Sequence, residues 1–234
     1  MILKKIIPNL FLFFLVFCNL ISSCKNNAPT VDSQQQVNNS PQPTTARKQH
    51  SIMFFGNSLT AGYGLDNPAN GFVALIQQRL DSLKQPYNCI NAGLSGETTI
   101  DGSNRVDWTI AQQPFDIFIL ELGGNDALRG TPPSEAQKNL QIIIDKVRAK
   151  NPSAKIILAG MEAPRNLGKN YTDAFHDIYT ALAKKNNIAL IPFLLEKVGG
   201  VSQLNQSDGI HPNIAGNLIL RENVWSVLKT ILKD

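Results

Sequence analysis

The 234-residue sequence has few cysteines and few histidines, three of each. It contains neither a paired-cysteine motif nor a His-Glu-x-x-His motif. We therefore expect no metal site of a recognisable type, because such sites need clustered thiolate, imidazole or carboxylate ligands. A phosphate-binding loop of the Walker type is also missing. The chemistry of this chain is expected to need no cofactor.

Most of the chain also has no excess of either positive or negative charge. The net charge of the whole sequence is +4, but residues 50–234 contain 17 basic and 17 acidic side chains. This region has no run of Lys and Arg and no interleaving of aromatic with basic residues. Proteins that bind nucleic acids normally carry a concentrated basic surface. We therefore expect no nucleic-acid partner.

Only one long hydrophobic stretch occurs, the 16 residues from Ile6 to Ile21, directly after Lys4 and Lys5. A membrane-spanning helix needs about 20 apolar residues, so this segment, interrupted by Asn9 and Asn19, is short for a span. A basic start followed by an apolar stretch is typical of a secretory signal. An uncleaved membrane anchor is the alternative.

The hydrophobic stretch ends in Ile21-Ser22-Ser23-Cys24, which resembles the lipobox of bacterial lipoproteins. The resemblance implies a signal peptide over residues 1–23 and a lipid group on Cys24. The protein would then be a lipoprotein of the bacterial cell envelope, held to a membrane on the periplasmic or surface side. A secreted protein with an incidental cysteine is the alternative, and the leaflet is left open.

Two further regions follow Cys24. Residues 24–49 are rich in Asn, Gln, Ser, Thr and Pro, and they have too few apolar side chains to form a core, which predicts a flexible tether. Residues 50–234 have the length and composition of one domain with a full hydrophobic core. This domain contains a single cysteine, Cys89, so no disulfide is expected within it, and Cys89 is expected to be a core residue rather than a nucleophile.

From residue 51 onward, short apolar runs alternate with segments of helical periodicity, a pattern typical of a parallel sheet covered by helices. The predicted strands are 51–56, 87–92, 116–122, 155–161 and 188–193, and the predicted helices are 71–84, 99–111, 134–150, 171–187 and 212–232. Right-handed crossovers place helices on both faces of the sheet. We therefore expect an α/β fold, a flavodoxin-like three-layer α/β/α sandwich with a five-stranded parallel sheet in the order 2-1-3-4-5.

Polar residues follow the predicted strands. Ser58 comes directly after the first strand, Gly96 and Asn125 follow the second and third strands, and Asp208 and His211 follow the fifth. The carboxyl ends of parallel strands meet at one edge of a sheet, where open α/β sheets bind their ligands. We expect these residues to converge in one cleft.

The types of these residues suit acyl transfer. A serine hydroxyl needs a base within hydrogen-bond reach, and a carboxylate should fix the tautomer of that base. His211 and Asp208 can supply this pair, because Gly209 permits a tight turn between them. His50 precedes the first strand and His176 lies in a predicted helix, so His211 is the natural candidate. Taken alone, an Asp-x-x-His segment before a helix is more often a capping turn.

Acyl transfer also places negative charge on the carbonyl oxygen, and each preorganised donor to that oxygen is worth about 3 kcal/mol. The backbone N–H groups of Ser58 and Gly96 and the side-chain amide of Asn125 are candidate donors. The sequences around Gly96 and Asn125 are equally typical of ordinary turns. It is their combination with His211 and Asp208 that favours a catalytic function.

Four blocks of the sequence together resemble the SGNH or GDSL hydrolase family over most of residues 51–215. They are Gly-Asn-Ser-Leu-Thr-Ala-Gly at 56–62, Asn-Ala-Gly-Leu-Ser-Gly-Glu-Thr-Thr at 91–99, Leu-Gly-Gly-Asn-Asp-Ala-Leu-Arg-Gly at 122–130 and Asp-Gly-Ile-His-Pro-Asn at 208–213. The blocks look like one branch of this family, bacterial periplasmic enzymes known as thioesterases, lysophospholipases and arylesterases.

The resemblance implies the flavodoxin-like sandwich and a role for each candidate residue. Ser58 would be the nucleophile, His211 the base and Asp208 the carboxylate that orients it. The N–H groups of Ser58 and Gly96 and the amide of Asn125 would form the oxyanion hole.

One position departs from the commonest family pattern, which has Asp where this chain has Asn57. Asn keeps an acceptor oxygen but loses the charge, which leaves the pH dependence open.

These features predict a serine esterase that hydrolyses acyl esters or thioesters through an acyl-serine intermediate. Leu128, Met161 and Leu167 are candidates for an apolar groove, with Arg129 near a phosphate or coenzyme head group, although ordinary loop residues fit the sequence equally well. A carbohydrate acetylesterase and a catalytically silent lipid-binding lipoprotein are the alternatives. The sequence leaves the physiological substrate and the oligomeric state open.

Overall fold

A five-stranded parallel sheet organises residues 50–232, the part of the chain that the computed structural model describes. The strands are β1 His50–Gly56, β2 Tyr87–Gly93, β3 Ile117–Glu121, β4 Lys155–Ala159 and β5 Ala189–Ile191. Their order is β2-β1-β3-β4-β5, and all neighbouring pairs are parallel, which confirms the predicted topology. The signal peptide, Cys24 and the tether predicted within residues 1–49 lie outside the described residues.

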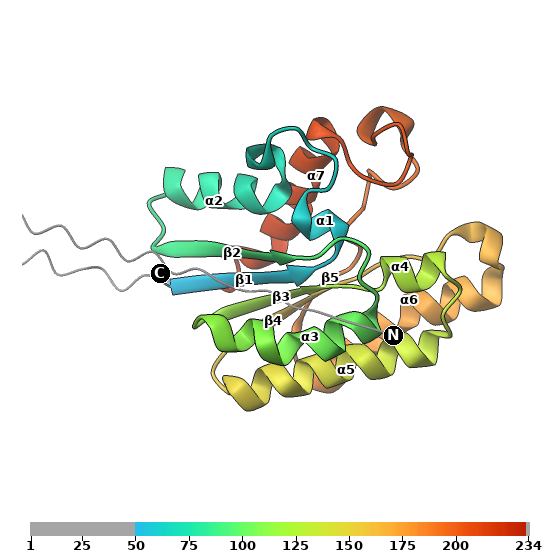
Figure 1. The fold of residues 1–234 in the computed structure, drawn as a ribbon, viewed down its shortest axis with the longest axis horizontal. Helices are drawn as coiled ribbons and strands as arrows, with labels where there is room; N and C mark the ends of the chain where they lie inside the picture. The colour runs from blue at the N-terminus through green and yellow to red at the C-terminus, as the bar shows by residue number, and fades with distance from the viewer. Residues whose placement is uncertain (1–49, 233–234) are drawn as a thin grey trace, which may run out of the picture. The chain divides into compact units, whose positions relative to one another are not determined.

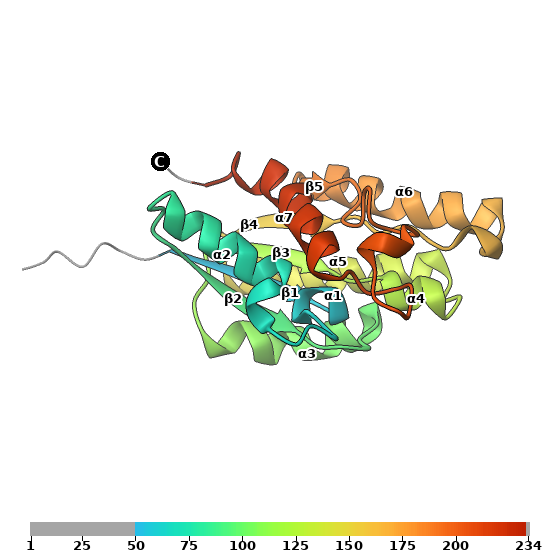
Figure 2. The same ribbon diagram turned by 90° about the horizontal axis from the view of Figure 1, so that it is seen from above.

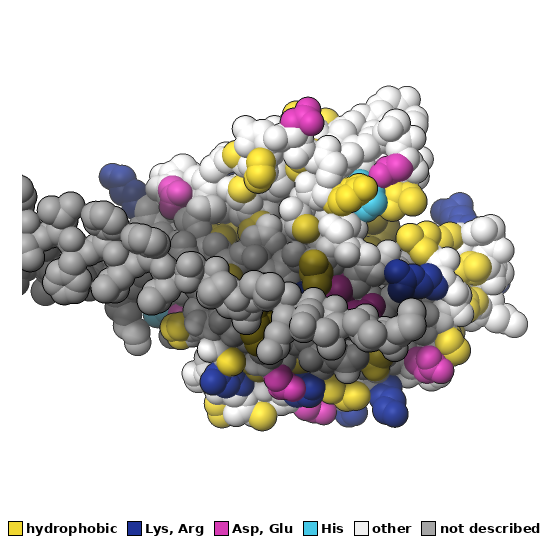
Figure 3. Space-filling view, in the orientation of Figure 1, with side chains coloured by type: hydrophobic (Ala, Val, Ile, Leu, Met, Phe, Trp, Pro, Cys, Tyr) yellow, Lys and Arg dark blue, Asp and Glu magenta, His cyan; other side chains and the backbone are white. Residues whose placement is uncertain are grey.

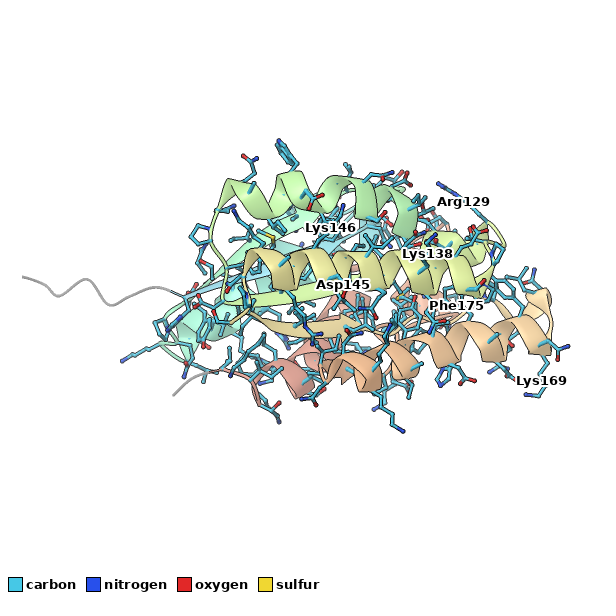
Figure 4. The ribbon with its side chains drawn as sticks, turned by 90° about the horizontal axis from the view of Figure 1, so that it is seen from below. Arg129, Lys138, Asp145, Lys146, Lys169 and Phe175 are labelled. Carbon is cyan, nitrogen blue, oxygen red and sulfur yellow. The ribbon has the colours of Figure 1, made fainter. Side chains whose placement is uncertain are left out.

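Helices cover both faces of the sheet, as predicted (Figure 1). One face carries α2 Phe72–Ser82 and α7 Ile214–Leu228, which lie side by side (Figure 2). The other carries α3 Thr99–Gln112, α5 Pro133–Lys150 and α6 Lys169–Asn186, seen together from below in Figure 4. Within residues 50–232, no helix has the combination of length and apolar content that crossing a membrane requires.

Five short elements lie between the strands and long helices. They are the α-helices α1 Ser58–Ala61 and α4 Gly124–Leu128 and the 3-10 helices η1 Pro68–Asn70, η2 Arg165–Leu167 and η3 Ser202–Leu204. The sequence did not predict them, because a helix of three to five residues is too short to show a hydrophobic period.

The central strands are buried on both sides of the sheet. All five residues of β3 are buried, as are the last five of β1. Continuous apolar runs are typical of parallel strands with helices on both faces. The aromatic rings of Phe55 and Phe118 stack across these two strands with their centroids 5.6 Å apart. The core that supports the site therefore lies directly beneath the ends of β1 and β3.

Most element boundaries differ from the prediction by a few residues, and two of these differences have a clear local cause. The last helix begins at Ile214 rather than at 212, because Asn213 caps it by accepting a hydrogen bond from Gly216 N at 3.1 Å. Pro212 instead pairs with Asn205 in an isolated β-bridge. β5 ends at Ile191, directly before Pro192, which has no N–H with which to continue a strand ladder.

Glu121, the last residue of β3, is a carboxyl group buried at the end of the sheet and only 1% exposed. Its Oε2 accepts hydrogen bonds from Asn57 N at 3.1 Å and from Thr60 N and Oγ1 at 3.3 and 2.8 Å. A Cβ atom on Gly56 would lie 2.4 Å from this oxygen, so only glycine leaves room for it. Glu121 thus ties β3 to α1, the short helix that begins with Ser58.

Burial raises the pKa of Glu121 from its usual 4.5 to about 7, because the charged form loses its water, and the hydrogen bonds from Thr60 and Asn57 offset only part of this cost. The folded protein therefore binds this proton more tightly than the unfolded chain does. Between about pH 4.5 and 7 the contribution of Glu121 to the free energy of unfolding falls as the pH rises.

We expect Glu121→Gln to remove this pH dependence. The difference between the free energies of unfolding, variant minus wild type, should increase as the pH rises from 4.5 to 7.5. At 1.36 kcal/mol per pKa unit, this increase is up to about 3 kcal/mol. Urea unfolding at several pH values measures this difference. Glu135→Gln, at an exposed position of α5, is the control and should follow the wild type. Parallel pH profiles for Glu121→Gln and the wild type would contradict the expectation.

Candidate active site

Three strands end at the same level of the sheet. In the strand register, Gly56 of β1 pairs with both Gly93 of β2 and Glu121 of β3. The loops that follow these strands carry Ser58, Gly96 and Asn125. Figure 1 shows α1, α4 and the segment before α7 at this same end of the sheet. The parallel register therefore brings residues from distant parts of the chain to one edge.

Ser58 is the first residue of α1, and its side chain is held at the base of the site. Asn57 caps this helix, because its Oδ1 accepts a hydrogen bond from Leu59 N at 3.1 Å. The acceptor oxygen that Asn57 keeps in place of a carboxylate therefore makes a local turn hydrogen bond. Ser58 is only 9% exposed, so its hydroxyl is largely shielded from bulk water.

A chain of short hydrogen bonds links Ser58 with His211 and Asp208. His211 Nε2 lies 2.9 Å from Ser58 Oγ, and His211 Nδ1 lies 2.6 Å from Asp208 Oδ2. The second carboxylate oxygen, Asp208 Oδ1, accepts hydrogen bonds from the backbone N–H groups of Ile210 and His211 at 2.9 and 3.0 Å. This arrangement can take a proton from the serine hydroxyl.

These hydrogen bonds also keep Asp208 ionised. The hydrogen bond from the His211 side chain, helped by the backbone N–H groups of His211 and Ile210, lowers the pKa of Asp208 from its usual 3.8 to about 2. An ionised carboxylate at 2.6 Å favours a proton on Nδ1 of the imidazole. The lone pair of Nε2 is then free to accept the hydrogen of Ser58 Oγ.

The loop that carries His211 is fastened to the segment after α1. Gly209 has a φ of +69°, which provides the tight turn expected between Asp208 and His211. Gln206 N donates to His211 O at 2.7 Å, and Gln206 Nε2 donates to Tyr63 O at 2.8 Å. The ring of Tyr63 lies against the imidazole of His211, with centroids 4.6 Å apart. Tyr63 therefore limits the movement of His211 on one side.

Gly96 and Asn125 belong to neighbouring segments, which a hydrogen bond from Asn125 to Glu97 joins. Gly96 has a φ of +87°, a conformation that favours glycine, while Asn125 is in the first turn of α4. Asn125 Nδ2 donates to Glu97 O at 2.8 Å, which leaves the second hydrogen of this amide for another acceptor. Within residues 50–232, the backbone N–H groups of Ser58 and Gly96 donate to no protein acceptor. All three groups can thus donate to an oxyanion.

The candidate groove residues differ in their exposure. Leu128 and Leu167 are 53% and 37% exposed. Met161 is instead part of the hydrophobic core beneath Gly124 and is only 4% exposed. Arg129, labelled at the α4 end of the molecule in Figure 4, donates from its guanidinium to Gly96 O at 3.1 Å. Figure 3 shows hydrophobic side chains gathered around a histidine and an acidic side chain on this part of the surface.

Cys89 has the properties of a packing residue. It is partly buried against the core, and burial raises the pKa of its thiol to about 12, so it is almost entirely protonated at neutral pH. Among the described residues 50–232, no group of three or more His, Cys, Asp and Glu side chains is arranged to hold a metal ion.

Sequence reasoning missed three residues that shape the site, namely Tyr63, Glu97 and Glu121. Glu121 did leave a signal, because it is the one charged residue in the apolar run from 117 to 122. Glu97 adjoins Gly96, but its partner Arg105 lies in the next helix and only the fold reveals the contact. Tyr63 reaches His211 across 148 positions of sequence, which no local pattern indicates.

Comparison with known proteins agrees with this geometry. A model of the GDSL-like lipase/acylhydrolase family matches residues 54–219. Esterase TesA of Pseudomonas aeruginosa is 42% identical over 182 residues, which cover 78% of this chain and 89% of TesA. The Escherichia coli protein named thioesterase 1/protease 1/lysophospholipase L1 is 36% identical over 163 residues, covering 70% of this chain and 76% of that protein.

Solved structures share the fold. The crystal structure of TesA superimposes with a TM-score of 0.74 at 41% identity and covers 78% of this chain and 100% of its own. The psychrotrophic esterase EstA from Pseudoalteromonas sp. gives a TM-score of 0.73 at 31% identity, covering 78% of this chain and 98% of its own. The chain therefore belongs to the GDSL-like lipase/acylhydrolase family and is a serine esterase of the SGNH type.

Proposed function

We propose that this esterase hydrolyses acyl esters and thioesters, with Ser58 as nucleophile, His211 as base and Asp208 as the group that orients His211. Ser58 Oγ attacks the acyl carbon while its proton passes to His211 Nε2. The same proton then goes to the departing alcohol or thiol, which leaves an acyl group on Ser58. Water then attacks this acyl group while His211 Nε2 takes one of its protons, and that proton passes to Ser58 Oγ as the carboxylic acid departs with the other.

The oxyanion of each tetrahedral intermediate is assigned to three donors from the segments that follow β1, β2 and β3. They are the backbone N–H groups of Ser58 and Gly96 and the side-chain amide of Asn125. These groups are held by the fold before substrate arrives, so little reorganisation is needed when charge develops on the carbonyl oxygen. The observation that carries the proposal is the continuous chain of contacts from Asp208 to His211 to Ser58, at 2.6 and 2.9 Å.

The surroundings of Ser58 support a substrate with an apolar acyl part. Tyr63, Leu128 and Ile210 are 53%, 53% and 48% exposed, although they are large hydrophobic side chains. Tyr63 touches His211, and Ile210 is the residue before it. Exposed apolar side chains around a polar reaction centre are typical of sites for acyl chains. Relatives named esterase, thioesterase and lysophospholipase agree with this class of substrate.

We also propose that Cys24 carries a lipid group that attaches the enzyme to a membrane of the bacterial cell envelope. The sequence Ile21-Ser22-Ser23-Cys24, directly after a hydrophobic segment, supports this assignment. An acyl anchor together with the tether at 24–49 would keep residues 50–234 near lipid, where esters of fatty acids are abundant.

Ser58→Ala should abolish turnover, because among residues 50–232 only the Ser58 hydroxyl is hydrogen-bonded to His211 Nε2. We expect a fall in kcat of at least about 1,000-fold on p-nitrophenyl esters from acetate to palmitate. Ser226→Ala, at an exposed position of α7, should keep full activity. The chain length with the highest kcat/KM distinguishes an enzyme for long acyl groups from an acetylesterase. Equal activity of the Ser58→Ala variant and the wild type would refute the mechanism.

Asp208→Asn should keep the fold and lower kcat by about 1,000-fold or more, because an amide does not favour the required imidazole tautomer. Since the pKa of Asp208 is about 2, its titration should not contribute to the pH dependence of kcat between pH 5 and 9 in the wild type. Its contribution to stability is present above about pH 4 and is lost only as the pH falls toward 2. Asp145→Asn on α5, labelled in Figure 4, is the matched control. A wild-type kcat for Asp208→Asn would exclude the orienting role.

Cys24→Ala should release the enzyme from the membrane fraction of a Gram-negative host and abolish labelling by radioactive palmitate. Cys89→Ala should remain in the membrane fraction, because the proposed anchor is unchanged. Both variants should hydrolyse soluble esters as the wild type does. Retention of Cys24→Ala in the membrane would instead indicate an uncleaved N-terminal anchor.

A further inference from the structure

We propose that the ion pair between Glu97 and Arg105 positions the oxyanion hole of this enzyme. The inference rests on the donor roles proposed above for Gly96 and Asn125. Neither Glu97 nor Arg105 is assigned any contact with the substrate, and both act through the groups that they hold.

The ion pair has a two-pronged geometry in a shielded place. Arg105 Nε and Nη2 lie 2.5 and 2.6 Å from the two carboxylate oxygens of Glu97, whose side chain is only 7% exposed. The same guanidinium donates to Ala92 O at the end of β2 and to Thr109 Oγ1 on α3, each at 3.1 Å. It also lies over the ring of Phe55, 4.2 Å from the centroid. Arg105 is thus fixed to β2, α3 and the core together.

Glu97 connects this fixed guanidinium to two of the three proposed oxyanion donors. Its backbone directly follows Gly96, so the side-chain anchor limits the movement of the peptide that carries the Gly96 N–H. Its carbonyl oxygen accepts the hydrogen bond from Asn125 Nδ2 at 2.8 Å, which sets the orientation of that amide. Glu97 therefore holds the backbone donor of Gly96 through their shared peptide bond and the side-chain donor of Asn125 through a hydrogen bond.

Magnitudes favour a positioning role over a purely stabilising one. A buried ion pair contributes little net stability, because the cost of removing both charges from water offsets most of their attraction. Two parallel hydrogen bonds between a guanidinium and a carboxylate nevertheless restrict both groups to one geometry. A displacement of about 1 Å at a catalytic group lowers the rate about 100-fold, so this restriction has a large effect at an oxyanion hole.

The test uses Arg105→Lys in the full-length protein, which keeps the positive charge but removes the two-pronged contact. We expect kcat on a p-nitrophenyl ester to fall about 10- to 100-fold while KM changes less than about twofold. The inhibition constant of phenylboronic acid, which forms a tetrahedral adduct with an active serine, should rise by a similar factor. A smaller folded fraction would lower kcat without weakening this inhibitor, so the two effects are separable.

Two further variants complete the design. Glu97→Gln combined with Arg105→Met removes both charges, so no unpaired charge is buried, and this variant should fold even if Arg105→Lys does not. It should show the same loss of kcat and of inhibitor affinity. Asp107→Asn is the matched control, because Asp107 is on the same helix and pairs with Lys146 at 2.7 Å, but its side chain is 63% exposed. Figure 4 shows Lys146 beside α3, on the side of the molecule that faces the viewer. This control should keep the wild-type kcat and inhibition constant.

The proposal is overturned if a folded variant without the pair keeps the wild-type kcat, or loses kcat with an unchanged inhibition constant for phenylboronic acid. Either outcome leaves the proposed function intact, provided that wild-type turnover still depends on Ser58. Absence of Ser58-dependent turnover in the wild type would instead refute the proposed function itself.

Discussion

The parallel register of β1 with β2 and β3 is the constraint on which the rest of the site depends. Because Gly56 pairs with Gly93 on one side and with Glu121 on the other, three strands end at one level. The loops that leave this level carry Ser58, Gly96 and Asn125. A shift of one residue in either pairing would turn every side chain of a strand to the opposite face. The burial of all of β3 and of the last five residues of β1 opposes such a shift, so the core of the sheet also fixes the geometry at its edge.

Three carboxyl groups near Ser58 differ in their environments. Glu121 is buried with no ion-pair partner among residues 50–232, and burial raises its pKa to about 7, so both of its protonation states are populated near neutral pH. Glu97 is buried against a guanidinium. Asp208 lies near the surface, where hydrogen bonds from His211 and Ile210 keep it ionised. The neighbours of each carboxyl group thus determine what it is suited to do. Glu121 holds a helix, Glu97 holds a loop, and Asp208 is placed to orient a base.

Much of the fold and of the candidate site followed from local patterns. The apolar runs that became β1 and β3 and the helical period of α5 depend on neighbours within a few residues, so these elements were predictable. The layers and the strand order then followed from the right-handed crossovers of alternating strands and helices. Ser58, Gly96, Asn125, Asp208 and His211 were predicted as site residues because each follows a predicted strand and because the blocks that contain them resemble one hydrolase family. The start of α7 was misplaced, since the capping by Asn213 was not recognised, and the short helices α1 and α4 have no period to detect.

The sequence by itself determined the layered α/β architecture and the residues available for acyl transfer, because burial period and chemical type are local properties. Only the tertiary structure decided the contacts that make these residues act together. The pairing of Glu97 with Arg105, the ring of Tyr63 against His211 and the carboxyl of Glu121 beneath α1 join elements distant in sequence. Such contacts depend on the precise positions of side chains, and these positions are set by how the helices pack on the sheet.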